Sequence, residues 1–322
     1  MSAETRAWYA RFAAEARAIG SPLYGHLSES VASNPAILDF LDQLPASRRQ
    51  PNLLLAAVRH VAGLAEDGAD LAAKIETHGE AIAALMRTRT TQTNEPGRCA
   101  TLLPVLGQIE GPLALLEVGA SAGFCLLPDL YGYRYGEREI APGAPSAPIL
   151  PCDACVETPL PRRLPQVAWR AGLDLAPIDP DDPEAIAWLQ TLIFPEQQDR
   201  ATRLESAIAL VRAKRPRVVA GDLRHDLSEL AAQAPRTARL VIYHTAVLCY
   251  VPGDEGQNFA SRTRELGAVW ISNESPDVFP HIAAKAPARP DAGCFLLAVN
   301  GAPVAWTHPH GRSIAWFADP PL

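Results

Sequence analysis

The stretch LLEVGASAGF, residues 115–124, carries the residues with the clearest chemical possibilities. An apolar run ends in a turn of small residues, 119–123, and we expect the chain to continue into a helix. Such a turn can present bare backbone to a nucleotide-like cofactor. It can also hold Ser121 as the nucleophile of a G-x-S-x-G elbow. The rest of the chain has to distinguish these two functions.

The hydrolase alternative requires a scaffold that the sequence does not provide. A serine elbow follows a central strand, after several earlier strands and an upstream oxyanion-hole loop. Here the turn follows the first predicted strand, helical patterns precede it, and no HGGG-like segment occurs. A triad in the order Ser, acid, His could still be assembled from a downstream histidine, namely His225, His244, His308 or His310. The missing scaffold disfavours Ser121 as a nucleophile.

A cofactor turn at the switch point of a doubly wound sheet is the favoured alternative. Gly119 permits the tight turn, and Gly123 permits close packing of a helix on the strand. The next two predicted strands end in acids. Asp174 is placed to bind ribose hydroxyls, and Asp222 is placed to accept a hydrogen bond from an adenine amino group.

The acid Glu117, two residues before the first glycine, indicates which cofactor fits. The spacing E-x-G-x-x-x-G differs from the dinucleotide motif G-x-G-x-x-G, and an acid would face a pyrophosphate. S-adenosylmethionine, with its cationic sulfonium and ammonium groups, suits an acidic turn. Alternatively, the three acids merely cap strands and helices. The predicted cofactor-binding residues here are Glu117, Gly119, Ala120, Ser121, Gly123, Asp174, Leu175, Asp222 and Leu223.

A second polar segment, TQTNE at 91–95, extends this prediction. Thr93 and Asn94 offer hydroxyl and amide groups that could hold an amino-acid moiety, and Arg98 could bind its carboxylate. A capped helix start with Pro96 in its first turn explains the same residues. The two functions are compatible.

Four residues are candidates for catalysis. His244 in YHTAVLCYV could act as a general base, with Tyr250 near the end of that run. Glu274 ends WISNES, at a strand edge where ligands bind in such sheets. Tyr24, in SPLYGHL, could close the substrate side. For His244 the alternative is a satisfied core residue, and for Tyr24 it is simple packing.

The elements that must position these residues alternate along the chain. Residues 1–100 carry helical periodicity and predict an all-helical cap domain. Residues 101–322 predict a largely parallel sheet with helices on both faces and an antiparallel end. A Pro-rich insert at about 136–166 predicts an ordered wrap or a lid. The predicted strands are 112–119, 167–175, 217–223, 239–251, 267–275, 294–301 and 312–317, with a helical pattern over Pro183–Lys214.

Composition limits the partners. The net charge of −7 argues against nucleic acid, and no run reaches the roughly 18 apolar residues of a membrane span. The N-terminus has no signal-peptide core, so we expect a cytoplasmic protein with reduced thiols. No metal is predicted, because Cys152-x-x-Cys155 has no second pair and His308 and His310 have no acidic or thiol partner nearby.

Several of these segments together resemble the DUF2332 family, uncharacterised bacterial proteins whose core is similar to class I S-adenosylmethionine-dependent methyltransferases. The resemblance covers nearly the whole chain. It implies a Rossmann-like cofactor domain with a helical N-terminal cap, and it implies that TQTNE lies against the cofactor pocket. The segments that carry it are SPLYGHL, PNLLLAAV, RTTQTNEPGRC, LLEVGASAGF, WRAGLDLAPID, VVAGDL, YHTAVLCYV and HPHG.

The leading functional hypothesis is an S-adenosylmethionine-dependent methyltransferase that acts on a small molecule, as a monomer or homodimer. A second hypothesis keeps the cofactor but makes it the substrate of a cyclase, which would form azetidine-2-carboxylate and methylthioadenosine. A third is a non-catalytic cofactor-binding protein. The serine hydrolase is the remaining alternative.

Overall fold

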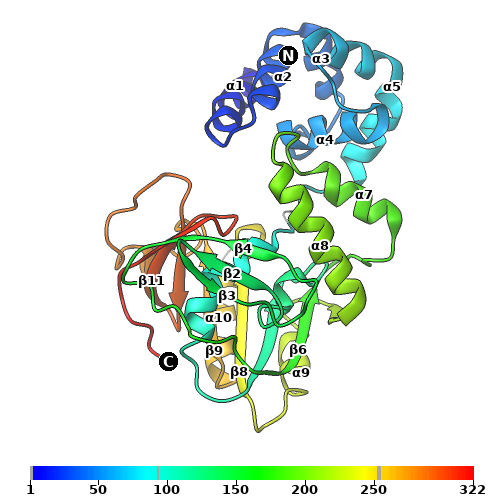
Figure 1. Ribbon diagram of the computed structural model, residues 1–322. Helices are drawn as coiled ribbons and strands as arrows, with labels where there is room; N and C mark the ends of the chain where they lie inside the picture. Colours follow the sequence, from blue (N-terminus) through cyan, green and yellow to red (C-terminus); the bar gives the residue numbers. More distant parts are fainter. Residues whose placement is uncertain (1–2, 93, 252–254) are drawn as a thin grey trace. The chain divides into compact units, whose positions relative to one another are not determined.

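The computed structural model describes residues 3–92, 94–251 and 255–322 (Figure 1). They form two compact units. The helical unit contains residues 1–93 and 181–202, and the sheet unit contains residues 94–180 and 203–322. The segment 181–202 therefore interrupts the sheet unit in sequence but packs with the helices.

Proline and N-capping residues mark where helices of the helical unit begin. Asn34, Asp67 and Asp182 each accept hydrogen bonds from the first free backbone N–H groups of the helix that follows. Buried apolar side chains, among them Leu54 and Trp188, form one core. The helices are α1 (Ala3–Ala18), α2 (Pro22–Ser33), α3 (Pro35–Asp42), α4 (Pro51–Ala62), α5 (Gly68–Thr88) and α7 (Pro183–Thr191).

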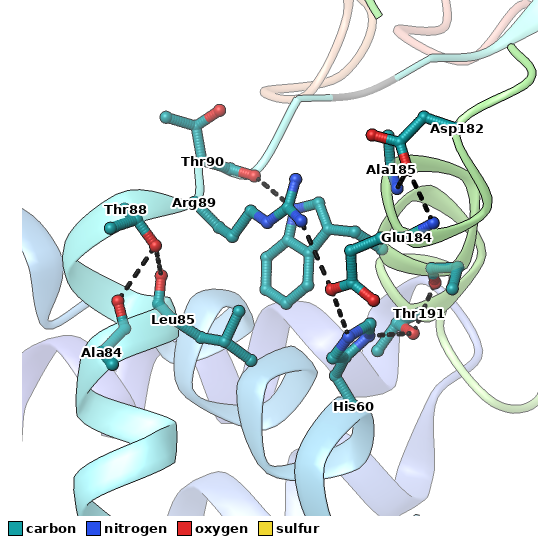
Figure 2. A network of polar contacts seen from close by, with 12 residues as sticks. His60, Ala84, Leu85, Thr88, Arg89, Thr90, Asp182, Glu184, Ala185 and Thr191 are labelled. Atoms are coloured by element: carbon teal, nitrogen blue, oxygen red, sulfur yellow. Dashed lines mark hydrogen bonds and ion pairs between the residues drawn. The ribbon is translucent and has the colours of Figure 1, made fainter. Parts of the chain in front are cut away.

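Polar contacts attach α7 to the N-terminal helices (Figure 2). His60 Nε2 lies 3.0 Å from Glu184 Oε1, and Arg89 Nη2 lies 3.3 Å from the same oxygen. The Trp188 indole donates to the Thr90 carbonyl at 3.0 Å. These contacts, together with burial of Trp188, explain why a segment distant in sequence belongs to this unit.

The sheet unit is built on a nine-stranded sheet with the order β5-β12-β11-β10-β9-β8-β1-β6-β7. The five strands from β7 to β9 are parallel to one another. The pairs β9–β10, β10–β11 and β11–β12 are antiparallel, whereas β12 and β5 are parallel. The chain passes from β1 to β6 and β7, then returns to β8 on the other side of β1, so the strand order reverses there. The bounds are β1 (Leu113–Val118), β6 (Val167–Asp174), β7 (Arg217–Ala220), β8 (Arg239–Thr245), β9 (Val269–Glu274), β10 (Phe295–Val299), β11 (Ala302–Thr307), β12 (Ser313–Trp316) and β5 (Asp153–Ala154).

The helices of the sheet unit are mostly short. All residues of α6 and β1 are buried, and for β1 this is expected of a central parallel strand. Helix α8 starts in the helical unit and ends in the sheet unit. The bounds are α6 (Cys99–Leu106), α8 (Gln198–Lys214), α9 (Leu227–Ala231), α10 (Glu255–Glu265) and α11 (Pro280–Ala283).

The Pro-rich insert and the residues just before it form short strands. β2 (Gly132–Tyr135), β3 (Arg138–Ile140) and β4 (Ile149–Pro151) make a small sheet with the order β3-β2-β4. The same segment then supplies β5, which pairs with β12 at the edge of the large sheet. The insert thus connects the central strand β1 to one outer edge of the large sheet.

The α/β class, the largely parallel sheet and the N-terminal helices are confirmed, but several details of the prediction are wrong. The turn after β1 leads into a single 3₁₀ turn, Phe124–Leu126, rather than an α-helix. The left-handed residues Ser121 and Gly123 (φ 50° and +79°) break the helical path before it can start. The predicted strand at 239–251 ends at Thr245, because Ala246 is also left-handed (φ 56°).

Two further differences concern element boundaries. The helical pattern over 183–214 is two helices, α7 and α8, with Pro195 in the connection between them. Strand β11 was not predicted, although it pairs with both β10 and β12.

Candidate functional site

The turn between β1 and the 3₁₀ segment is held tightly by the protein itself. Gly119 has φ +73°, and a Cβ there would lie 2.3 Å from Val247 Cγ2. The Gly119 N–H donates to the Leu173 carbonyl at 2.8 Å. Glycine is therefore required by the backbone angle and by the close approach of Val247. The side chain of Ala120, at the next position, likewise occupies the space that a Cβ on Gly172 would need.

Asp174, at the end of β6, binds the turn directly. Its Oδ2 accepts the Ser121 N–H at 2.8 Å, and its Oδ1 accepts the Ala176 N–H at 2.8 Å. The Ile178 N–H donates to the Ser121 carbonyl at 3.2 Å, closing the loop. Each carboxylate oxygen keeps a further acceptor position, so binding a ribose hydroxyl there stays a prediction.

Asp222 follows β7 and is paired with Arg224. The Arg224 Nε lies 2.9 Å from Oδ1 and 3.0 Å from Oδ2, and this pairing lowers the pKa of Asp222 to about 2. Leu223 is half-buried, whereas Leu175 is 77% exposed beside the end of β6. Arg224 also lines a hollow of about 420 Å³, together with His225 and residues of α10, and Asp222 is not part of that lining.

Glu117 is the most unusual acid of the site. Its side chain is 4% exposed, and its Oε2 has no hydrogen-bond partner. Burial raises the pKa of Glu117 well above the usual value, Cys125 and Asp174 raise it further, and Arg98 opposes them. The carboxyl group is consequently biased toward its protonated form.

Of the TQTNE residues, Asn94 contacts the turn. Its Oδ1 accepts the Ala122 N–H at 3.3 Å, and its Nδ2 is buried without an acceptor. Glu95 caps the following 3₁₀ turn by accepting the Gly97 N–H at 3.0 Å. The other residue predicted here, Thr93, lies outside the described residues.

Arg98 is almost fully buried and binds backbone. Its Nε donates to the Pro309 carbonyl at 2.9 Å, and its Nη1 donates to Thr245 O at 3.0 Å. Close packing of Gly97 and Gly311 joins the same two segments, since a Cβ on Gly311 would lie 1.9 Å from Gly97 O. The NEPGR and HPHG segments therefore pack directly against each other, and the hydrogen bond from Arg98 to Pro309 O stabilises this packing.

His244 and Glu274 meet inside the protein. Glu274 Oε1 lies 2.7 Å from His244 Nδ1, and His244 Nε2 accepts the Trp270 Nε1–H at 3.0 Å. His244 is 0% exposed, and Phe259 lies edge-on to its ring. Because both ring nitrogens are engaged, this geometry favours the core role for His244 over general-base catalysis.

Glu274 also fixes the segment that follows β8. Its Oε1 accepts the N–H groups of Val247 at 2.8 Å and Leu248 at 3.1 Å, while its Oε2 is buried without a partner. This places Val247 against Gly119. Glu274 thus fixes the glycine turn indirectly, through Val247. It is buried and does not face solvent as a general base would.

The two predicted tyrosines differ completely in exposure. Tyr250 is 79% exposed, on a 3₁₀ turn after β8. Tyr24 is 2% exposed in the core of the helical unit, and burial raises its pKa to about 12. Its position favours the packing role.

Ser121 shares one feature with a nucleophile elbow, its left-handed φ of 50°. The α-helix that should follow an elbow is absent from the residues after the turn, and Ser121 is 8% exposed. His244 has no free nitrogen to activate it. These observations weaken the hydrolase alternative further.

The sequence reasoning missed Arg203, on α8. Its Nε forms an ion pair with Glu95 Oε1 at 3.6 Å, beyond hydrogen-bonding distance, and the Nε–H has no hydrogen-bond acceptor. The side chain is 13% exposed. No local signal distinguishes this arginine from others on a charged helix, because its neighbour Glu95 lies 108 residues earlier.

The cysteines and histidines add no assembled centre. All six cysteines are free, and Cys155 Sγ accepts the Trp316 N–H at 3.1 Å. Among the described residues, no three His, Cys, Asp or Glu side chains are grouped to hold a metal ion. No helix within the described part of the chain has both the length and the apolar character to cross a membrane.

The fold and site together define an α/β protein whose large, mostly parallel sheet carries acids at the carboxyl ends of β1, β6 and β7. The chain belongs to the family described as "Uncharacterized protein conserved in bacteria (DUF2332)", whose family model matches residues 6–316. The resemblance seen in the sequence is therefore confirmed. No curated protein matches the chain.

Proposed function

We propose that the sheet unit binds S-adenosylmethionine at the carboxyl ends of β1, β6 and β7 and transfers its methyl group to a small molecule. The observation that carries this proposal is Glu117, a buried carboxyl with a partnerless oxygen beside a glycine turn where the strand order reverses. Ligands of open α/β sheets bind at such a reversal. The parallel order β7-β6-β1-β8-β9 corresponds to the order 3-2-1-4-5 of a doubly wound sheet and so supports this proposal.

The polar groups near the turn fit the two ends of this cofactor. Glu117 Oε2 is available to an ammonium group, and Asn94 Nδ2 is a buried donor without an acceptor. Asp174 keeps acceptor positions for a ribose, and the exposed Leu175 offers an apolar surface. Both oxygens of Asp222 accept two hydrogen bonds each from Arg224, so an adenine amino group would have to displace part of that pairing. Both aspartates are already bonded within the protein, so we expect them to assist binding rather than to dominate it.

When bound, S-adenosylmethionine supplies an electrophilic methyl group. The protein must then align the acceptor and exclude water, and it needs little acid–base chemistry. This agrees with the enclosed positions of His244 and Glu274. Tyr250 is the exposed polar side chain among the predicted catalytic residues and is the candidate for contact with the acceptor.

Calorimetric titration of the full chain with S-adenosylmethionine tests binding. We expect micromolar affinity, weakened by about tenfold or more in Glu117→Gln, with the exposed Glu137→Gln as matched control. Asp174 is left intact because its loss would open the turn. Absence of binding by the folded wild-type protein would refute the proposal.

The same titration has a second readout. A cation beside Glu117 lowers its raised pKa, so binding should release a proton. The measured enthalpy near pH 7 should therefore depend on the ionisation enthalpy of the buffer. The dependence should be reduced in Glu117→Gln and unchanged in Glu137→Gln.

Product analysis separates the reactions that share this site. Incubation with small-molecule acceptors should yield S-adenosylhomocysteine. In the cyclase alternative, the amino group attacks the γ-carbon, the carbon–sulfur bond breaks, and methylthioadenosine leaves with the electron pair as the amine loses a proton. Release of methylthioadenosine without an acceptor would replace the methyltransferase by the cyclase. Binding without either product would indicate a non-catalytic protein.

A further inference from the structure

We propose that Arg203 binds the carboxylate of an α-amino-acid moiety, so that the site at the glycine turn selects ligands that carry such a moiety. The inference rests on the proposed function and assigns a residue to one end of the ligand. It replaces Arg98, the arginine that the sequence suggested for this contact.

Arg98 is committed elsewhere. Its guanidinium donates to Pro309 O and to both the carbonyl and the hydroxyl of Thr245. These contacts hold the Gly97 turn to the segment after β8 and to the HPHG turn. Moving Arg98 to a ligand would dismantle them.

Arg203, in contrast, forms an ion pair but its Nε–H makes no hydrogen bond. Its nearest acid, Glu95 Oε1, is 3.6 Å from Nε, and that oxygen already accepts the Gly97 N–H at 3.0 Å. The Nε–H is buried and has no acceptor. Buried donors nearly always have a partner, and an arginine fork matches the two oxygens of a carboxylate.

The residues between Glu95 and the glycine turn indicate the rest of the ligand. Glu95 follows Asn94, whose Oδ1 holds the turn at Ala122 and whose Nδ2 is a second buried donor without an acceptor. Glu117, two residues before the turn, has a buried oxygen without a partner. An α-amino acid presents a carboxylate beside an ammonium group. The unpartnered donors Arg203 Nε and Asn94 Nδ2 match its carboxylate, and the unpartnered oxygen of Glu117 matches its ammonium group.

A competing explanation is that Arg203 only neutralises Glu95 in the folded protein. In that case its loss would weaken every ligand of the site equally, or none of them. A pair of ligands that differ in the amino-acid moiety therefore distinguishes the two roles. S-adenosylhomocysteine carries this moiety, and methylthioadenosine has the same nucleoside without it.

The experiment is calorimetric titration of both ligands into the wild type, Arg203→Met, Arg203→Lys and the control Arg217→Met. Arg217 lies at the opposite end of β7, where it bonds Gln233. We expect Arg203→Met to weaken S-adenosylhomocysteine by about 10- to 100-fold and to leave methylthioadenosine within about twofold. Arg203→Lys should restore part of the loss, since it keeps the charge but not the fork.

The outcomes separate the inference from the proposed function. If the wild type binds both ligands and Arg203→Met changes them equally or not at all, the role of Arg203 is wrong and the proposed function stands. If the folded wild type binds neither ligand, both are wrong. Urea unfolding of each variant checks that the losses do not come from unfolding.

Discussion

At the scale of single residues, Glu117 combines burial, an oxygen without a hydrogen-bond partner and a raised pKa. A buried carboxyl with an unsatisfied oxygen destabilises the folded protein unless it is protonated or meets a ligand. Both routes depend on its raised pKa. The pH dependence of stability therefore reports on this residue directly.

For Glu117 the folded-state pKa is raised, so its protonated form is the one that favours folding. That contribution is complete below the unfolded-state pKa of about 4.3 and is lost as the pH rises through the folded-state value. The free energy of unfolding of the wild type should thus fall relative to Glu117→Gln as the pH rises above about 4.3, by at most about 1.4 kcal/mol per pH unit. Urea titrations at several pH values measure this difference. A difference that stays flat, as expected for Glu137→Gln, would contradict the assigned pKa.

His244 provides a second test at the same scale. Its removal leaves the Trp270 donor and the Glu274 carboxylate without their partner and opens a cavity beside Phe259. We expect His244→Ala to lower the free energy of unfolding by about 3–5 kcal/mol, measured by chemical denaturation. Unchanged stability would instead favour an accessible imidazole and return His244 to the candidate bases.

At the scale of elements, the segment after β8 determines the shape of the glycine turn. Glu274 fixes Val247, and Val247 occupies the space that a side chain at position 119 would need. The end of β9 is thereby connected to the end of β1, although β8 lies between them in the sheet.

A double-mutant cycle measures this connection. Gly119→Ala should cost about 2–4 kcal/mol, from the positive φ and from overlap with Val247. In a Val247→Ala background the overlap disappears and about 1–2 kcal/mol should remain, because the backbone angle is unchanged. Denaturation of the four proteins gives the coupling energy. Strict additivity would show that Val247 does not constrain the turn.

At the scale of the whole molecule, the helical unit depends on residues that come from the middle of the chain. Trp188 is 4% exposed within its core, and Glu184 contacts both His60 and Arg89 (Figure 2). The stability of helices α1–α5 is therefore linked to α7.

Trp188→Ala in the full chain should destabilise the helical unit by about 3–5 kcal/mol and leave the sheet unit folded. Hydrogen exchange followed by mass spectrometry would then show faster exchange in α1–α5 and unchanged exchange in β1 and β8. An exposed control on the same helix, Gln190→Ala, should have an effect below about 1 kcal/mol. Uniform acceleration over the entire chain would mean that the two units unfold together.

Much of the fold could be predicted because its signals are local. The apolar runs at 112–119, 167–175 and 267–275 match β1, β6 and β9 closely, and helical periodicity marked the first hundred residues. The missing helix after Gly123 and the early end of β8 could not be predicted. They depend on left-handed backbone at Ser121 and Ala246, which residue type alone does not specify.

The sequence by itself determined the fold class, the family and the positions of Glu117, Asp174 and Asp222 at strand ends, because periodicity and turn residues act between near neighbours. Only the tertiary structure decided what each side chain contacts. It paired Asp222 with Arg224, enclosed His244 between Glu274 and Trp270, bound Arg98 to backbone carbonyls and left the Arg203 Nε–H without a hydrogen-bond acceptor. Such partners are mostly distant in sequence, so packing selects them.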